Sequence, residues 1–240
     1  MNGTGIIEAF KTYLDIKTSL TAPGYEDDEV LLFLNNAQDQ FISQRLFGKN
    51  FQPPAFEDNP KRVADILPLV RRQGLASALI SAATTYGSGA YLIDKSTLYN
   101  GRVLYNIELD VRVTRSNPVS VDEFYRCERI KHESIGRFIQ SKANKTHFLY
   151  PKITEDKDYY YVICDSHTTL VDYARGVFIV RPYPITATGL EYDGTYGATH
   201  MSLRPETHQE IVDIATTDAL QILGDPRWQS KLSNEQLQTN

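Results

Sequence analysis

A histidine and three carboxylates occur close together near residue 208, and side chains of these types bind metals or transfer protons. The stretch RPETHQEIVDIA, which begins at Arg204, contains Glu206, His208, Glu210 and Asp213. A metal-binding helix of the HExxH kind needs a second histidine four residues after the first, on the same face. Here the positions three and four residues after His208 are apolar, and His208 continues an apolar helical stripe. We therefore expect a hydrogen-bonded histidine at a packing boundary, beside a solvated acidic face.

The other residues with catalytic potential are dispersed along the chain. Asp165, Ser166 and His167 are adjacent, but neighbours in a chain rarely orient toward one another as a catalytic triad does. The chain has no G-x-S-x-G nucleophile elbow, and residues 85–91 lack the spacing of a phosphate-binding loop. We therefore expect no catalytic residue, no metal and no cofactor. The alternative is a hydrolase of unknown substrate that uses His208 or His167 with nearby acids.

The charge balance argues against a protein that binds nucleic acid over a broad basic face. The chain has 240 residues, a formal net charge of −5 and a pI of about 5.6. Cys127 and Cys164 form no CxxC pair, so we expect two reduced thiols, buried or inert. The chain shows neither a signal sequence nor an apolar run of the roughly 18 residues that a membrane span needs. We expect a soluble intracellular product.

The first third of the chain is expected to be helical. Apolar residues recur at steps of three and four from residue 6 to residue 20, as one face of a helix requires. A second helix is expected over residues 26–48, with acidic residues in its first turn and a glycine at its end. A third segment is expected over residues 59–70, and Pro68 makes it short or kinked.

The middle of the chain is expected to be mostly β. Residues 102–116 alternate between apolar and polar side chains. The residues assigned to one face are Tyr105, Ile107, Leu109, Val111 and Val113. Residues 159–165 and 176–185 are short apolar runs, and two prolines place the end of the second run at a sheet edge or outside the ladder. Residues 121–138 are interpreted as a strand followed by a short helix.

The last regular element is predicted to be a long helix that begins at Pro205 and ends at Gly224. Its apolar stripe is Ile211, Ala215, Ala219 and Ile222. Together the patterns predict an α+β fold, with N-terminal helices and a long C-terminal helix packed with a sandwich- or barrel-like β-rich middle region. The expected divisions are a helical segment (residues 1–75), a β-rich body (76–200), a C-terminal helix that joins the helical part (201–228) and a polar tail (229–240).

Four stretches of the chain resemble the ring, or head-to-tail connector, proteins of tailed bacteriophages, particularly those of the crAss-like group. EDDEVLLFLNNAQDQFISQRLFG is similar to an early helix in which an Asn-x-Ala-Gln segment leads to an arginine. LYNGRVLYNIELDVRVTRS resembles the strand pair that opens the β portion, and RCERIKHESIGRFIQSKANKTHFLYPKI resembles its middle. VFIVRPYPI followed by ETHQEIVDIATTDALQILGDPRWQS resembles the C-terminal strand and helix most closely. The family's strand commonly carries an Arg-Lys-Pro run, where this chain has Arg181-Pro182 without the lysine.

The resemblance implies a structural role and not a reaction. Proteins of this family assemble as a ring, commonly of twelve copies, below the portal of the capsid, where the ring extends the DNA channel and seats the next tail component. A virion protein of the neck, assembled in the host bacterial cytoplasm, is therefore expected. The implied partners are further copies of the chain, the portal protein and other tail or ring proteins, while genome DNA passes without sequence-specific binding. Arg181, Tyr183, Arg227 and Trp228 are the expected partner-binding residues. A tail or tail-fibre adaptor is the alternative among virion parts.

Overall fold

The computed structural model describes residues 3–18, 24–47, 60–82, 89–115, 124–135, 138, 150–164, 168–186, 190–192, 196–198 and 202–222. Two compact units are present: a helical unit made of Met1–Leu69 and Pro182–Asn240, and a β unit made of Val70–Arg181. The helical unit is formed by the N-terminal and C-terminal parts of the sequence, and the β unit is formed by the middle part. The chain thus has the predicted α+β class.

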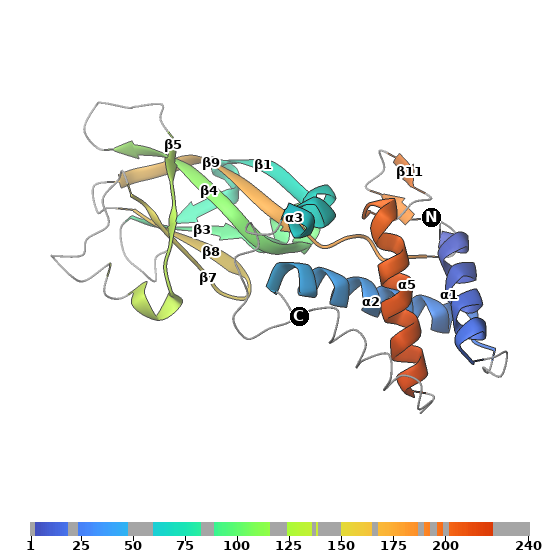
Figure 1. Ribbon diagram of the computed structural model, residues 1–240. Coiled ribbons are helices and arrows are strands. Elements are labelled where there is room, and N and C mark those ends of the chain that lie inside the picture. The colour runs from blue at the N-terminus through green and yellow to red at the C-terminus, as the bar shows by residue number, and fades with distance from the viewer. Residues whose placement is uncertain are drawn as a thin grey trace. The chain divides into compact units, whose positions relative to one another are not determined.

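In the helical unit, the first two helices pack against the last one, as Figure 1 shows. These helices are α1 (Gly3–Thr18), α2 (Asp27–Phe47) and α5 (Pro205–Ile222). Each buries an apolar stripe of the kind that the three- and four-residue spacing predicts. Residues with at most 3% exposure in these stripes include Ile6, Phe10 and Leu14 of α1, Val30, Leu34 and Phe41 of α2, and Ile211, Val212 and Ala215 of α5. Burial of these stripes holds the ends of the sequence together.

The described part of the helical unit also contains a short helix and a pair of short strands. α3 (Pro60–Ile66) packs against α2, and the strands β10 (Leu190–Tyr192) and β11 (Tyr196–Ala198) form an antiparallel pair. The third predicted segment is therefore short, but the prediction that it extends through Val70 is wrong. The helix ends at Ile66, a 3-10 turn follows at Leu67–Leu69, and Val70 begins a strand. Pro68 lacks the amide hydrogen that a continuing helix would use.

The β unit contains two sheets, which lie across one another in Figure 1. The four-stranded sheet has the antiparallel order β1 (Val70–Ala76), β9 (Thr168–Val180), β4 (Val103–Arg115), β5 (Phe124–Arg126). The five-stranded sheet has the order β2 (Ile80–Ala82), β3 (Ala90–Asp94), β8 (Tyr159–Ile163), β7 (Lys152–Glu155), β6 (Glu128–Arg129). The β6–β7 pair is parallel, and the other described pairs in this sheet are antiparallel.

Both edges of one sheet continue into edge strands of the other. Cys127 alone separates β5 from β6, and a 3-10 turn at Ser77–Leu79 separates β1 from β2. The two sheets share a core, whose buried members include Leu75, Tyr91, Ile93, Leu109, Val111, Tyr160, Val162, Ala174 and Phe178. This arrangement confirms the prediction of a sandwich- or barrel-like β region.

The strand β4 departs from the alternation that its sequence predicts. Leu109, Val111 and Val113 are buried, as predicted for one face of the strand. Tyr105 was assigned to the same face but is 37% exposed, whereas its neighbour Asn106 is only 4% exposed. The register against β9 shifts between Asn106 and Glu108, so Ile107 is an extra residue that exchanges the two faces of the strand. The prediction that Tyr105 shares the face of Leu109 is wrong because the period of two does not continue through a bulge.

The two units change over at Leu69–Val70 and Arg181–Pro182, whereas the sequence-based division was placed at residues 75 and 200. Val70 already pairs with β9, so residues 70–75, which the sequence-based division gave to the helical segment, belong to the β unit. At the other end, Pro182 and Pro184 lie beyond the last residue of β9, as the prolines predict. The end of α5 also differs from the prediction, because Ile222 is 72% exposed and does not continue the buried stripe.

Both cysteines are free and buried in the β unit, as expected from their spacing. Cys127 lies at the corner between β5 and β6, where its backbone N–H donates to the Leu109 carbonyl at 2.8 Å. Burial, with Cys164 and Asp110 nearby, raises the pKa of the Cys127 thiol well above its ordinary value. Among the helices of the described residues, none combines the length and apolarity needed to cross a membrane.

Candidate functional site

The histidine that first suggested a site is a packing residue of α5. His208 is 2% exposed, and its Nε2 lies 3.1 Å from the carbonyl oxygen of Leu203. Because a carbonyl oxygen only accepts, the imidazole donates at Nε2. The helix begins three residues earlier at Pro205, so this bond fixes the chain just before its first turn. The predicted hydrogen-bonded histidine at a packing boundary is confirmed.

The acids of α5 bind cations of the neighbouring helices. Glu210 accepts from Arg45 of α2 at 2.6 Å, and Asp213 lies 3.3 Å from Lys17 of α1. Arg45 also binds Asp65 of α3 at 2.8 Å, and both of these side chains are only 13% exposed. Glu210 and Asp213 each keep a side-chain exposure of 41%, so the acidic face is solvated as expected, and its acids also join helices. In the described part of the chain, no group of three His, Cys, Asp or Glu side chains could hold a metal ion.

The predicted partner-binding residues fall in different places. Arg181 is exposed just after β9, where its backbone N–H donates to the Arg102 carbonyl at 2.7 Å. Tyr183 is partly buried in the helical unit, where its N–H donates to the Ser202 hydroxyl at 3.4 Å. Arg227 and Trp228 lie outside the described residues, as do His167, the glycine at position 224 and the predicted polar tail.

Two amides of the Asn-x-Ala-Gln motif bind the RPYPI segment. The Asn35 side chain accepts from the Ile185 N–H at 2.7 Å and donates to the Ile185 carbonyl at 3.1 Å. The Gln38 amide donates to the Tyr183 carbonyl at 3.2 Å. These bonds satisfy backbone groups of a segment that has just left the sheet ladder. Two motifs that carry the resemblance thus contact each other inside the helical unit. In the sequence, the amide of Gln38 on an otherwise apolar helix face was the available sign that this face binds polar backbone groups.

The outer face of the four-stranded sheet carries ion pairs. Arg175 of β9 bonds Asp110 of β4 at 2.8 Å, directly across the ladder. Arg112 of β4 donates through Nε to both carboxylate oxygens of Asp172, at 3.0 and 3.1 Å. Asp172 is an extra residue of β9, which allows it to face Arg112 although the next residue, Tyr173, pairs with that arginine. The register shift at Asp172 therefore makes this ion pair possible.

Aromatic rings lie among these charges. The rings of Phe124 and Tyr173 meet edge to face, with centroids 5.8 Å apart, and the Arg175 guanidinium lies 4.4 Å from the Phe124 centroid. A hollow of about 600 Å³ opens on this face, with Arg72 and Gly74 of β1 also in its lining. A Cβ at Gly74 would approach the Tyr173 hydroxyl to 2.0 Å, so the glycine leaves room for the Tyr173 side chain in this lining.

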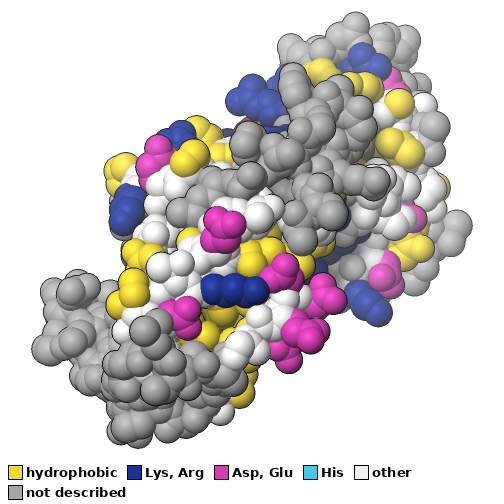
Figure 2. All heavy atoms as spheres, turned by 90° about the vertical axis from the view of Figure 1, so that its right-hand side faces the viewer, with side chains coloured by type: hydrophobic (Ala, Val, Ile, Leu, Met, Phe, Trp, Pro, Cys, Tyr) yellow, Lys and Arg dark blue, Asp and Glu magenta, His cyan; other side chains and the backbone are white. Residues whose placement is uncertain are grey.

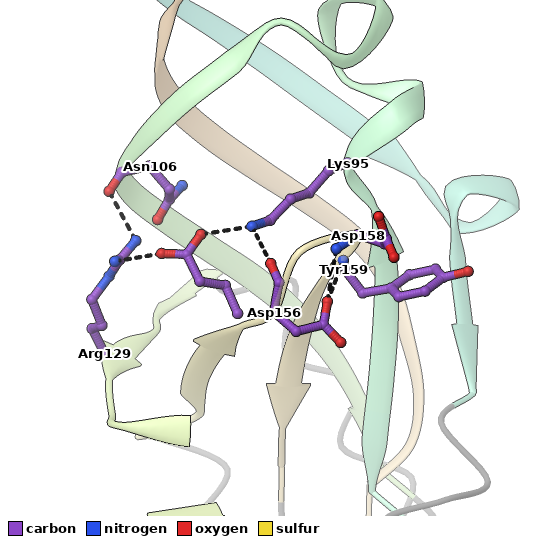
Figure 3. Close-up of polar contacts among 7 residues, drawn as sticks. Lys95, Asn106, Arg129, Asp156, Asp158 and Tyr159 are labelled. Atoms are coloured by element: carbon purple, nitrogen blue, oxygen red, sulfur yellow. Dashed lines mark hydrogen bonds and ion pairs between the residues drawn. The ribbon is translucent and has the colours of Figure 1, made fainter. Parts of the chain in front are cut away.

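A second charged cluster fixes the turn between β7 and β8. The Lys95 ammonium and the Arg129 guanidinium bind the Glu155 carboxylate at 2.9 and 2.7 Å. Figure 3 shows that these two cations approach the cluster from opposite sides. The Lys95 ammonium also donates to the Asp156 carbonyl at 2.6 Å. Asp156 in turn accepts from the N–H groups of Asp158 and Tyr159 at 2.9 and 2.7 Å. Since the carboxylates are already bonded within the turn, this cluster acts as a structural clamp.

Comparisons with known proteins identify no family. The chain matches no protein-family model, and no curated protein is similar enough to indicate common ancestry. The geometry therefore carries the functional argument. The clusters around His208 and Glu155 join elements of the fold. Among the residues that the structure describes, the sheet face of the β unit and the exposed apolar side chains of the helical unit remain available to a partner.

Proposed function

We propose that this chain is a structural virion protein that assembles as an oligomeric ring between the portal and the tail. In this role it extends the DNA channel and seats the next tail component. The observation that carries the proposal is the exposure of large apolar side chains on each of the three packed helices. They are Ile16 of α1 (71% exposed), Leu32 and Phe47 of α2 (62% and 57%) and Ile222 of α5 (72%). Helices that already have a buried core carry these side chains on their outer faces, where another subunit would cover them.

Assembly supplies the mechanism. Covering one such side chain contributes up to about 1.5–3 kcal/mol, so several of them across an interface offset the entropy lost on association. A closed ring uses head-to-tail contacts, in which each subunit presents two different complementary surfaces. The apolar positions of the helical unit and the charged, aromatic sheet face of the β unit differ in the required way.

The charge of the chain agrees with a DNA channel. A net charge of −5 gives the wall of such a channel little attraction for a passing phosphate backbone. Contact between the Asn-x-Ala-Gln and RPYPI segments also supports the proposal, since the resemblance rests on both and they stabilise one structural element.

The test is the mass of the purified protein in solution, alone and after mixing with the portal protein of the same phage. The expected result is a closed oligomer, of twelve copies by the family resemblance, that forms alone or on the portal. A protein that stays monomeric in both conditions would contradict the proposal.

A further inference from the structure

The two units carry opposite net charges. The helical unit contains 9 basic and 18 acidic residues, a net charge of −9, and the β unit contains 16 basic and 12 acidic residues, a net charge of +4. The moderate charge of the whole chain therefore conceals a strong separation between its units. Proteins whose surfaces carry opposite charges attract one another and select their relative orientation through these charges.

An acidic hollow lies between α2 and α5 in the helical unit. It measures about 500 Å³ and is lined by Phe33, Asn36, Asp39, Gln40, Asp218, Gln221 and Ile222. The Gln40 amide donates to the Asp218 carboxylate at 2.8 Å, which fixes one carboxylate in the wall. Burial raises the pKa of Asp218 because an ionised carboxylate loses hydration there. A cation placed nearby would restore the lost stabilisation.

The chemistry of this hollow fits a long basic side chain. Asp39 and Asp218 supply negative charge, and Phe33 and Ile222 supply apolar surface beside them. Lysine and arginine place an aliphatic stem on apolar surface and a charged end group beside carboxylates. Figure 2 shows exposed acidic side chains, with Lys and Arg side chains among them, interspersed with apolar ones on the face of the molecule that it presents.

The β unit offers a matching surface. Arg72 of β1 is exposed at the hollow of the sheet face, and Arg175, at 57% side-chain exposure, lies in the same lining. Asp110 neutralises part of the Arg175 charge, so Arg72 is the more suitable cation for an external carboxylate. The aromatic ring of Phe124 beside these arginines adds apolar surface to the contact.

We infer that the Asp39–Asp218 hollow of one copy binds the basic sheet face of a second copy, with Arg72 as a contacting cation. This inference rests on the ring proposed above and specifies which surfaces form its subunit contact. A second copy is the favoured occupant because the same chain carries both complementary charges. One contact of this kind leaves a free acidic hollow at one end and a free basic face at the other, which is the condition for head-to-tail growth.

Charge reversal tests the inference. Asp39→Lys alters the exposed carboxylate of the hollow, Arg72→Glu alters the basic face, and Glu8→Lys makes the same charge change at an exposed position of α1 outside the hollow. We expect Asp39→Lys and Arg72→Glu each to raise the protein concentration needed for assembly about tenfold or more, and Glu8→Lys to change it much less. Asp39→Asn, which removes the charge at nearly constant size, should show a smaller shift. Circular dichroism and thermal melting confirm that each variant is folded.

Mixing the two defective variants adds a second criterion. Asp39→Lys retains an intact basic face and Arg72→Glu retains an intact hollow, so the mixture should associate at concentrations where each variant alone does not. Raising NaCl from 0.1 to 1 M shortens the screening length from about 10 to about 3 Å and should weaken wild-type assembly.

The outcomes separate this inference from the proposed function. Rings that form equally well with all variants and in 1 M NaCl would overturn the charged contact while leaving the ring proposal in place. Variants that self-assemble normally but lose binding to the portal or to DNA would assign these surfaces to that partner, and would also overturn the inference. A wild-type chain that never assembles, alone or with portal, would contradict both.

Discussion

The imidazole of His208 links the first turn of α5 to Leu203, two residues before the helix begins, through the bond from Nε2 to the Leu203 carbonyl at 3.1 Å. Replacing His208 by alanine removes the donor and opens a space in a buried position. We expect the free energy of unfolding to fall by about 2 kcal/mol, the usual cost of leaving a buried polar group without its partner. Urea denaturation measures this change, and Glu206→Ala, at an exposed position of the same turn, is the control. A loss of metal binding or hydrolytic activity without a loss of stability would favour the hydrolase alternative.

Two glycines of the β unit differ in what surrounds them. A Cβ at Gly176 would lie 2.3 Å from the ring of Phe178, which is fully buried, whereas at Gly74 it would meet the terminal hydroxyl of Tyr173. A buried ring has little room to move, but the end of a partly exposed tyrosine can rotate away. We therefore expect Gly176→Ala to destabilise the protein by about 1–3 kcal/mol and Gly74→Ala by clearly less. Thermal melting of both variants checks the order, and equal losses would contradict it.

The buried Cys127 thiol and Tyr160 phenol predict how the free energy of unfolding depends on pH in the alkaline range. Burial raises the pKa of Cys127 from its ordinary 9.0 and also raises the pKa of Tyr160 from its ordinary 10.0. Both groups ionise more readily in the unfolded chain, so the stability they contribute is fully present below these ordinary values and is lost as the pH rises past them. The urea midpoint should fall between pH 8 and pH 11. Cys127→Ala and Tyr160→Phe should each flatten that decline, and a wild-type midpoint that stays constant would contradict this account.

At the scale of elements, Arg45 joins three helices of the helical unit. It extends from α2 to Asp65 of α3 and to Glu210 of α5, and its guanidinium lies 4.5 Å from the ring of Phe41. Removing one partner of a mostly buried ion pair leaves an uncompensated charge and costs about 3 kcal/mol. We expect this loss for Arg45→Met.

A double-mutant cycle with Asp65→Asn measures how much of this loss belongs to the pair. The exposed pair Lys11–Asp27, with side chains 43% and 59% exposed, serves as the control, and its coupling should stay below about 1 kcal/mol. Equal coupling energies in the two cycles would contradict the role assigned to Arg45.

The helices were predictable because their apolar spacing is local and continuous. The bulges were not, because the extra residues Ile107 and Asp172 look like members of an ordinary alternating strand until the partner strand is known. The same reason explains the acids of α5: their cations, Lys17 and Arg45, come from helices at the other end of the sequence. Sequence spacing identified the helical face, but it carried no information on what that face would meet.

The Asn35 and Gln38 amides show the same limit for the candidate site. Their partners lie 150 and 145 residues away in the chain, in the RPYPI segment. Both stretches were recognised from the sequence as features that resemble connector proteins, but their direct contact required the fold. Of the four predicted partner-binding residues, Arg181 and Tyr183 belong to this segment, and Arg227 and Trp228 lie outside the described residues. A role for them in partner binding stays a prediction.

At the scale of the whole molecule, the opposite charges of the two units are hidden in the sequence-wide net charge of −5, because the helical unit is assembled from both ends of the chain. Only the division into units separates the −9 of the helical unit from the +4 of the β unit. Because of this separation, the proposed ring protein has an acidic surface and a basic surface. Head-to-tail assembly needs two such different, complementary surfaces on each subunit.

The central claim is the position of this chain in a virion, between the portal and the tail. The most direct measurement is electron microscopy of purified phage particles in which the chain carries a label at its C-terminus. The account predicts label density in a ring at the neck, immediately below the portal vertex. Label at the tail tip, on fibres or on the capsid surface, or particles that contain no labelled chain, would contradict it.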